Sequence, residues 1–219
     1  MKEKIKGFIF DLDGVLTSTS EYHYLAWKKI AEELGIPFDR RKNESLKGVS
    51  RRESLIILLG GKKLDNSTFE ELLVRKNLYY LDYIKGITPG SLLPGALDIL
   101  NSIKEWGGKS AVASVSKNTD EVLKKLEIKD KFDVVLDGYS VKKTKPEPDQ
   151  FLLASRLLSI VPECCVVFED SAAGIEAAKR AQMFSIGIGD SETLNNADLV
   201  YDRLDKIEFN MMLNKLEKS

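Results

Sequence analysis

Two pairs of acidic residues stand where apolar runs of the chain end. Asp11 and Asp13 follow one such run, and Glu169 and Asp170 follow another. Carboxylates this close repel one another unless a cation or a proton lies between them. Four carboxylates without a histidine or cysteine cluster favour a hard cation with oxygen ligands. Mg²⁺ suits such a set because it keeps coordination positions for water and phosphate, so the acids predict a magnesium site.

Groups that could bind phosphate follow a third apolar run. Ser114, Ser116, Lys117 and Asn118 offer hydroxyls, an ammonium and an amide at the start of a predicted helix. Backbone N–H groups at such a helix start are also available to an anion. Lys145 lies in a lysine-rich loop that two prolines stiffen, and such a loop could hold one ammonium inward. Together these groups predict a phosphate site.

Each of these features has a plainer explanation, which the residues alone leave open. An acidic pair is often a solvated loop or a helix cap, and a run such as 116–119 is often an N-cap. A lysine-rich run such as 142–145 is usually a solvated loop. His23 is the only histidine, and a lone histidine on a helix is more often structural. The position of both acidic pairs at strand ends favours the chemical interpretation.

The elements that must position these residues alternate between strand and helix in the second part of the chain. Apolar runs predict strands at 110–113, 132–136, 164–168 and 184–188, and periodicity predicts helices at 96–106, 119–126, 148–158 and 172–181. This alternation is typical of a parallel sheet covered by helices on both faces. Ligands of such sheets bind beyond the carboxyl ends of the strands, where the groups described above would converge.

The first strand, 5–10, belongs to that sheet but precedes a stretch in which only helices are predicted, at 21–34, 53–59 and 69–84. We therefore expect an α/β fold. Its core would be a Rossmann-like, doubly wound parallel sheet, and an all-helical cap domain would be inserted after the first strand. The predicted core comprises residues 1–17 and 85–219, and the predicted cap comprises residues 18–84.

Composition excludes several classes of function. The chain carries 33 Lys and Arg against 34 Asp and Glu, and this net charge of -1 argues against a nucleic-acid binder. No run approaches the roughly 18 apolar residues of a membrane span, and the first residues lack the apolar stretch of a signal peptide. The adjacent Cys164 and Cys165 make no disulfide framework and are expected to be buried strand residues. We expect a monomeric, cytoplasmic enzyme that acts on a small molecule.

Four motifs, in order along the chain, resemble those of the haloacid-dehalogenase superfamily of phosphotransferases. The first is Phe10-Asp11-Leu12-Asp13-Gly14-Val15, the second Ser114, the third Lys145-Pro146 and the fourth Glu169-Asp170. The resemblance implies that Asp11 attacks phosphorus and becomes an aspartyl phosphate, while Asp13 exchanges protons with the sugar oxygen. It implies that Ser114 and Lys145 balance the charge of the transferring phosphoryl group. The implied ligands of Mg²⁺ are Asp11, Glu169, Asp170 and the backbone carbonyl of Asp13.

Further residues resemble the β-phosphoglucomutases of this superfamily. They are Glu21-Tyr22-His23, Trp27, Leu46-Lys47-Gly48-Val49-Ser50-Arg51 and Ala113-Ser114-Val115-Ser116-Lys117-Asn118. This resemblance implies interconversion of β-D-glucose 1-phosphate and glucose 6-phosphate, with β-D-glucose 1,6-bisphosphate as activator and intermediate. Arg51 would bind the distal phosphate, and His23 would form a hydrogen bond near Asp13. The other implied substrate-binding residues are Trp27, Lys47, Gly48, Ser54, Ser116, Lys117 and Asn118.

Two positions depart from the family pattern, and a second function stays open. Ser18 replaces an acid near the expected hinge, and Val115 stands where the family has alanine. The alternative function is a phosphatase of the same superfamily that hydrolyses a small sugar phosphate or a similar ester. The two differ in whether water or a sugar hydroxyl attacks the aspartyl phosphate, and His23, Lys47 and Arg51 favour the mutase. A binding module without catalysis would need a damaged site, and no catalytic position is missing.

Overall fold

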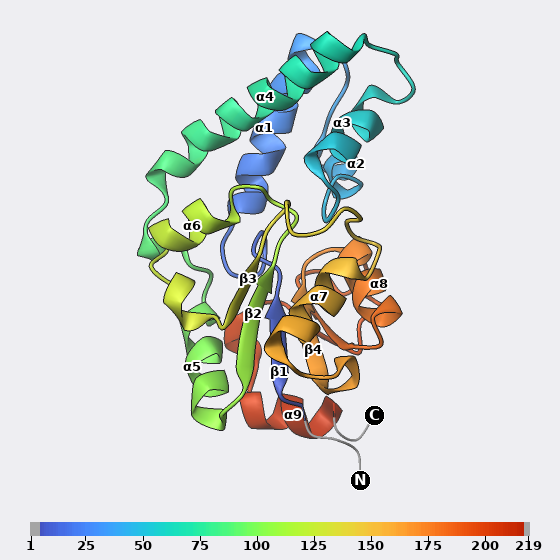
Figure 1. Cartoon of the computed structure of the whole chain (residues 1–219). Coiled ribbons are helices and arrows are strands. Elements are labelled where there is room, and N and C mark those ends of the chain that lie inside the picture. Colours follow the sequence, from blue (N-terminus) through green and yellow to red (C-terminus); the bar gives the residue numbers. More distant parts are fainter. Residues whose placement is uncertain (1–4, 217–219) are drawn as a thin grey trace.

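The computed structural model describes residues 5–216, which form a six-stranded sheet whose neighbouring strands are all parallel. In spatial order the strands are β3 (Val134–Leu136), β2 (Lys109–Ala113), β1 (Gly7–Phe10), β4 (Cys165–Glu169), β5 (Phe184–Ile188) and β6 (Leu199–Tyr201) (Figure 1). From β1 the chain winds outward through β2 and β3, and then outward through β4 to β6 on the other side. The predicted fold, a doubly wound parallel sheet, is confirmed, and its switch point lies at β1.

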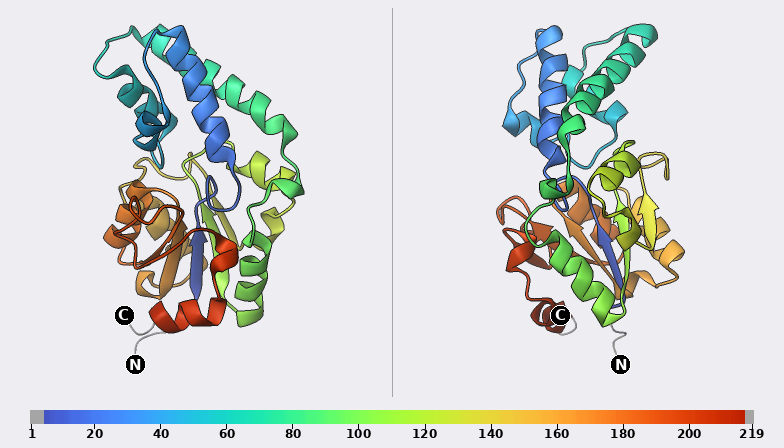
Figure 2. Two further views of the ribbon diagram at one scale, coloured as in Figure 1. Left: turned by 180° about the vertical axis from the view of Figure 1, so that it is seen from behind. Right: turned by 90° about the vertical axis from the view of Figure 1, so that its left-hand side faces the viewer.

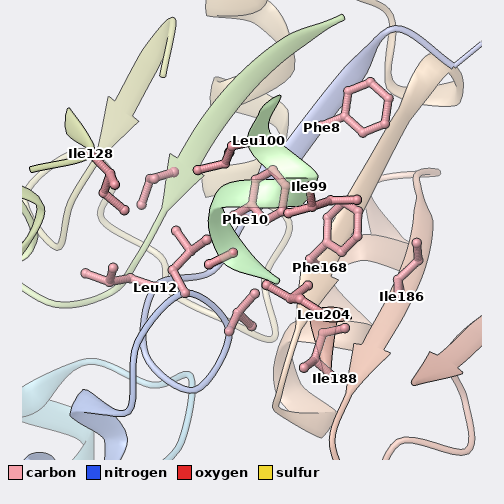
Figure 3. Close-up of a cluster of buried hydrophobic side chains, with 14 of the residues drawn as sticks. Phe8, Phe10, Leu12, Ile99, Leu100, Ile128, Phe168, Ile186, Ile188 and Leu204 are labelled. Atoms are coloured by element: carbon pink, nitrogen blue, oxygen red, sulfur yellow. The ribbon is translucent and has the colours of Figure 1, made fainter. Parts of the chain in front are cut away.

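Helices cover both faces of the sheet because successive strand residues point to opposite sides. Phe8 and Phe10 pack on one face and Ile9 packs on the other. The first face carries α5 (Ala96–Trp106), α6 (Thr119–Lys125) and α9 (Phe209–Leu216), and the second carries α7 (Asp149–Leu158) and α8 (Ala172–Arg180). The rings of Phe10 and Phe168 stack with their centroids 4.4 Å apart among the buried hydrophobic side chains of the first face (Figure 3). This packing fixes β1 and β4, whose carboxyl ends carry the acidic pairs.

A second group of helices follows β1 in the chain and stands beyond the carboxyl ends of the strands (Figures 1 and 2). It consists of α1 (Thr19–Glu33), α2 (Arg40–Glu44), α3 (Arg51–Leu59) and α4 (Asn66–Tyr83). These helices have a hydrophobic cluster of their own, which includes Trp27, Ile30, Leu55 and Leu72. The group is therefore placed to cover the end of the sheet where chemistry is expected.

The helical group is joined to the sheet by two segments that lie side by side. Thr17 and Leu92 form an isolated β-bridge, and the Thr17 hydroxyl donates to the carbonyl of Ser91 at 2.8 Å. Residues 18–84 thus leave and re-enter the core at one place. We propose that the chain is divided as its sequence predicts, into a core of residues 1–17 and 85–219 and a cap of residues 18–84. Residues 1–4 and 217–219 of that division, and the beginning of the amino-terminal stretch considered above, lie outside the described residues.

Local sequence explains where the pocket-facing helices begin. In α3 the Ser50 side chain accepts a hydrogen bond from the backbone of Glu53, whose carboxylate accepts one from the backbone of Ser50, and this capping box holds Arg51 at the helix start. In α8 the Ser171 side chain accepts from the backbone of Gly174. Short 3₁₀ turns connect other elements at Ile84–Gly86, Pro89–Ser91, Lys129–Lys131, Pro162–Cys164 and Leu204–Lys206.

The structure shows where the two cysteines lie and what kind of helices the described residues form. Cys164 and Cys165 are both buried, as expected; Cys165 begins β4, whereas Cys164 ends the 3₁₀ turn before it and is not a strand residue. Within residues 5–216, no helix combines the length and the apolar character that crossing a membrane requires.

Candidate active site

The loops after the three central strands meet at one end of the sheet. Phe10 is paired with Val112 of β2 and with Phe168 of β4, so the residues that follow β1 lie beside those that follow its two neighbours. Asp11 is 6 % exposed, whereas Ser114 and Glu169 are both completely buried. The parallel arrangement therefore brings the predicted acidic and hydroxyl groups together, as their positions at strand ends implied.

Lys145 is the positive centre of this cluster. Its side chain is 1 % exposed, and its Nζ donates to Asp11 Oδ1 at 2.5 Å and also to Glu169 Oε1. Glu169 Oε2 in turn accepts from the Ser171 hydroxyl at 2.8 Å. Burial raises the pKa of Asp11 well above its usual range, and the Lys145 ammonium opposes that rise. Lys145 thus favours the ionised form of Asp11, which is the form that a nucleophile requires.

The carboxylates of this cluster form a donor set suited to a hard cation. Burial raises the pKa of Asp170 to about 7, with Glu169 adding to the rise and Lys47 opposing it. Lys47 Nζ lies 3.4 Å from Asp170 Oδ2. No group of three or more histidine, cysteine, aspartate or glutamate side chains within residues 5–216 is arranged to hold an ion by itself. A backbone carbonyl, such as that of Asp13, would have to complete the set.

Gly14 makes room for one of these carboxylates. Its φ is +92°, and a Cβ at this position would lie 2.2 Å from Asp170 Oδ2. Burial raises the pKa of Asp170 and the negative charge of Glu169 adds to the rise, so a bound cation would favour the ionised form of Asp170. Oxygen donors and excess negative charge both fit Mg²⁺. We therefore propose that the side chains of Asp11, Glu169 and Asp170 and the backbone carbonyl of Asp13 are its ligands.

Asp13 has surroundings that differ from those of Asp11. The Thr19 hydroxyl donates to Asp13 Oδ1, and His23 Nε2 lies 3.6 Å from Asp13 Oδ2. Burial raises the pKa of Asp13, while the hydrogen bond from Thr19 opposes the rise. The carboxyl group of Asp13 therefore holds a proton at higher pH than an ordinary aspartate does. That property is needed in a group that gives a proton to a leaving oxygen.

His23 is held by a buried lysine and an aromatic ring. Its Nδ1 lies 2.6 Å from Lys76 Nζ, and its ring stacks on Tyr80 with the centroids 4.0 Å apart. When Lys76 carries its proton it can only donate, so Nδ1 then accepts and the imidazole proton is on Nε2, which faces Asp13. Burial lowers the pKa of His23 well below its usual range, with the charge of Lys76 acting in the same direction. A neutral imidazole therefore faces Asp13.

Lys76 itself is 2 % exposed and lies over the rings of Trp27 and Tyr80, at 5.2 and 5.0 Å from their centroids. Burial lowers its pKa well below the usual range, and the nearby Arg51 lowers it further. Two basic side chains thus share the cap side of the pocket, with aromatic and amide groups as their contacts. Such a place attracts an anion.

Arg51 lines the pocket from the start of α3, in the helical group. It is half-buried, and its Nη2 donates to Asn77 Oδ1 at 2.7 Å. The same Asn77 oxygen accepts from Asn118 Nδ2 at 3.0 Å. Burial lowers the pKa of the Arg51 guanidinium. The partner of this cation is thus a neutral amide rather than a carboxylate, which leaves its charge available to a ligand.

One pocket between the sheet and the helical group joins these parts. Eleven of the predicted residues line it: Asp11, Asp13, His23, Trp27, Lys47, Gly48, Arg51, Ser54, Ser116, Lys117 and Asp170. The other predicted residues stand behind this lining. Ser114, Lys145 and Glu169 are buried beneath it, and Asn118 is bonded to Asn77. Their functional roles remain proposals.

Known proteins resemble this chain over most of its length. A model of the haloacid dehalogenase-like hydrolase family matches residues 5–182. This chain belongs to that family. It is 46 % identical over 200 residues to a beta-phosphoglucomutase of Bacillus subtilis (strain 168), a match that covers 90 % of this chain and 88 % of the relative. The resemblance to the β-phosphoglucomutases expected from the sequence is confirmed.

Two further proteins that are similar to this chain differ from each other in the activity that their names give. The crystal structure of a beta-phosphoglucomutase from Clostridium difficile superposes with a TM-score of 0.94 at 42 % identity, covering 98 % of both chains. A phosphorylated carbohydrates phosphatase of Thermotoga maritima is 34 % identical over 182 residues, which cover 81 % of this chain and 82 % of the relative. Similar chains thus include both a mutase and a phosphatase.

Thr19, Lys76 and Asn77 contact predicted residues of the site but were not themselves predicted from the sequence. A signal for Lys76 was present, because Leu72, Lys76 and Tyr80 are spaced by four residues and are all buried on one face of α4. A lysine at an apolar position of a helical pattern indicates a special role. Thr19 and Asn77 carry no comparable signal, since their contacts depend on how α1, α4 and the loops meet.

Proposed function

We propose that this chain is a β-phosphoglucomutase, which interconverts β-D-glucose 1-phosphate and glucose 6-phosphate. The observation that carries the proposal is a single pocket that Asp11 lines from the core and Arg51 lines from the helical group. Lys145 contacts Asp11 from beneath the pocket, and Asn118 is joined to Arg51 through Asn77. A pocket that serves a sugar with two phosphates needs both sets, the one at Asp11 and the distal one at Arg51. The similar proteins from Bacillus subtilis and Clostridium difficile support the same activity.

The proposed reaction begins at Asp11. Its carboxylate attacks the phosphorus of the substrate and forms an aspartyl phosphate, so that one difficult transfer becomes two easier ones. The ammonium of Lys145 and the hydroxyl of Ser114 lie on the side of the core, where they would balance the charge of the transferring group. Lys145 also keeps Asp11 ionised before the attack.

Asp13 would move the protons of both half-reactions. It gives a proton to the sugar oxygen that leaves phosphorus, and it takes one from the sugar hydroxyl that later attacks the aspartyl phosphate. Its raised pKa keeps the proton available, while the Thr19 hydroxyl and the His23 imidazole orient the carboxyl group. This division of work gives two neighbouring aspartates opposite roles.

The proposed metal is Mg²⁺, bound by Asp11, Glu169, Asp170 and the backbone carbonyl of Asp13. When bound, it would withdraw negative charge from the oxygens of the transferring phosphoryl group. Glu169 is held for this purpose by Lys145 and Ser171. Asp170 is held against Gly14 and faces Lys47 of the helical group.

The distal set would hold the phosphate that is not being transferred. Arg51 would bind it with its guanidinium fork, together with Lys117 and Asn118. Transfer from the aspartyl phosphate to the bound sugar phosphate would give β-D-glucose 1,6-bisphosphate. When this intermediate turns end over end, its other phosphate meets Asp11 and the second product forms. His23, Trp27, Lys47, Gly48, Ser54 and Ser116 would contact the sugar or close the pocket around it.

A mutase must exclude water from the aspartyl phosphate, and contacts between the helical group and the core support such closure. Thr144 donates to Glu53 of α3 at 2.6 Å. A Cβ on Gly48 would lie 2.9 Å from the Ser171 hydroxyl oxygen, so this loop approaches the core closely. The alternative is a phosphatase that hydrolyses a small sugar phosphate, as the name of the Thermotoga maritima relative describes for that protein.

One assay separates the two functions. The enzyme is supplied with β-D-glucose 1-phosphate, Mg²⁺ and a trace of β-D-glucose 1,6-bisphosphate, and glucose 6-phosphate and free phosphate are both measured. The mutase is expected to give glucose 6-phosphate, and free phosphate as the main product would favour the phosphatase. Asp11→Asn should abolish both reactions, whereas Asp202→Asn, at an exposed position outside the pocket, should not. Turnover retained by Asp11→Asn would refute the nucleophile. We also propose that the enzyme is a cytoplasmic monomer, which sedimentation and cell fractionation can test.

A further inference from the structure

Asn77 joins the helical group to the core beside the part of the pocket that Arg51 lines. It lies on α4, and its Oδ1 accepts from Arg51 Nη2 at 2.7 Å and from Asn118 Nδ2 at 3.0 Å. Arg51 begins α3 of the helical group, and Asn118 precedes α6 of the core. One amide oxygen therefore holds two donors that come from opposite sides of the pocket.

The two bonds leave donors free for a ligand. A guanidinium carries five N–H groups and a primary amide carries two. Asn77 accepts one N–H from each partner, so most donors of Arg51 and one of Asn118 stay available. The oxygen does not have to be displaced when an anion binds. It sets the direction of both side chains before the anion arrives.

The charge of the contact matters as well. Arg51 is half-buried, and a carboxylate in the place of Asn77 would neutralise it. A neutral amide orients the guanidinium and keeps its full positive charge for the ligand. Asn77 therefore has the chemistry of a group that prepares a cation for an anion rather than one that pairs with it.

We propose that Asn77 is a positioning residue that sets Arg51 and Asn118 in the arrangement that binds the distal phosphate, and that it ties the helical group to the core through the same oxygen. The inference rests on the proposed function. This role of Asn77 restricts productive substrates to those that carry an anionic group, such as a phosphate on another sugar position, which binds to Arg51 and Asn118 while the reacting group meets Asp11. A phosphoryl donor without such a group gains nothing from Asn77.

The test compares β-D-glucose 1-phosphate, which accepts the phosphoryl group of Asp11 while its own phosphate is held by Arg51 and Asn118, with acetyl phosphate, which only donates a phosphoryl group. Asn77→Ala should raise the KM for β-D-glucose 1-phosphate about tenfold, because a hydrogen bond to a charged group contributes on that scale. Turnover of acetyl phosphate, whose single phosphate meets Asp11 and leaves Arg51 and Asn118 without a ligand, should change less than the KM for β-D-glucose 1-phosphate does. The matched control is Asn66→Ala at an exposed position of the same helix. It should change neither value.

Two further measurements separate this role from a merely structural one. Asn77→Asp keeps the shape and the acceptor but adds a negative charge, so it should raise the KM more than Asn77→Ala does, and added salt should reduce the difference. Asn77→Ala combined with Asn118→Ala should raise the KM about as much as the stronger single change, since both act on one site. A wild-type KM in Asn77→Asp, or independent effects in the double variant, would overturn the proposal.

The outcome does not depend on mutase turnover. Inhibition of acetyl phosphate turnover by glucose 6-phosphate reports the distal site directly, and Asn77→Ala should weaken that inhibition about tenfold. A wild type that is inhibited but makes no mutase product would contradict the proposed function and leave Asn77 testable. An equal inhibition constant in the wild type and in Asn77→Ala would contradict the role of Asn77 alone.

Discussion

Replacing Lys145 by methionine tests the buried charges on which the site depends. The Lys145 ammonium is almost fully buried and contacts Asp11 and Glu169. Methionine fills a similar volume without the charge, so the two carboxylates would be left together without their shared cation. Breaking a buried ion pair in this way costs about 3–5 kcal/mol of the free energy of unfolding. We expect a loss in that range at pH 8.

The sign of the pH dependence follows from Asp11. Burial already raises its pKa, Lys145 opposes the rise, and removal of Lys145 raises the pKa further. A folded-state pKa above the unfolded value means that stability falls as the pH rises through it. At pH 5 Asp11 can take up a proton and relieve part of the repulsion. The loss should then be smaller at pH 5 than at pH 8.

The assay is urea denaturation of the wild type and of Lys145→Met at both pH values, with a chelator present so that metal binding does not contribute. Lys143→Met, at an exposed position of the same loop, is the matched control and should change the free energy of unfolding by less than about 0.5 kcal/mol. A loss below about 1 kcal/mol at pH 8, or a larger loss at pH 5 than at pH 8, would refute the electrostatic account.

Three other changes address the proton transfer and the metal. His23→Ala should lower kcat by about 10- to 100-fold while the melting temperature and circular dichroism stay near those of the wild type, since the ring orients Asp13; an unchanged rate at saturating substrate would contradict this role. Thr19→Val removes a hydrogen bond that lowers the pKa of Asp13, so the high-pH limb of the kcat/KM profile should move to higher pH. A limb that stays in place or moves to lower pH would count against Asp13 as the acid. Gly14→Ala places a methyl group against Asp170 and should weaken Mg²⁺ binding, measured by calorimetry, by at least about tenfold; an unaltered affinity would exclude Asp170 as a ligand.

Most of the fold could be predicted because its pattern is local. Each buried strand is a short apolar run with a polar loop after it, and each long helix has an apolar stripe. The elements that were not predicted lack these features. The helix α2 consists of five polar or charged residues and is set by Asp39, whose side chain accepts from the backbone of Lys42 at 2.8 Å. The strand β6 is three residues long and only half-buried, and the short helix α9 follows it.

Helix boundaries were displaced for a related reason. The helix α4 was expected from Phe69, its first apolar residue, but begins at Asn66, because Asp65 caps it by accepting from the backbone of Thr68 at 2.9 Å. The helix α1 begins at Thr19 rather than Glu21, and its cap residue Ser18 makes no side-chain hydrogen bond. Apolar periodicity indicates which residues are buried, whereas the start of α4 is decided by its polar cap.

The core of the site was predictable and its cap side was less so. Asp11 and Glu169 stand at strand ends, and parallel strands bring such residues together whatever the loops do. The contact of His23 with Lys76 joins residues 53 positions apart and requires α1 and α4 to pack at one particular register. The bonds of Asn77 require the core loop at Asn118 as well. Such contacts depend on tertiary packing, which periodicity does not encode.

The central position of β1 has a consequence for how the chain is made. Residues 7–10 leave the ribosome before residues 109–112 and 165–168, with which their backbone groups pair. Their hydrogen bonds therefore remain incomplete until most of the chain has been synthesised. The helices of residues 19–83 pack mainly on one another and can form before β1 has paired with both of its neighbouring strands. The strand that positions Asp11 thus gains its second neighbour only after residue 165, and a pause in translation before that residue would leave one edge of an apolar strand unpaired and exposed to aggregation.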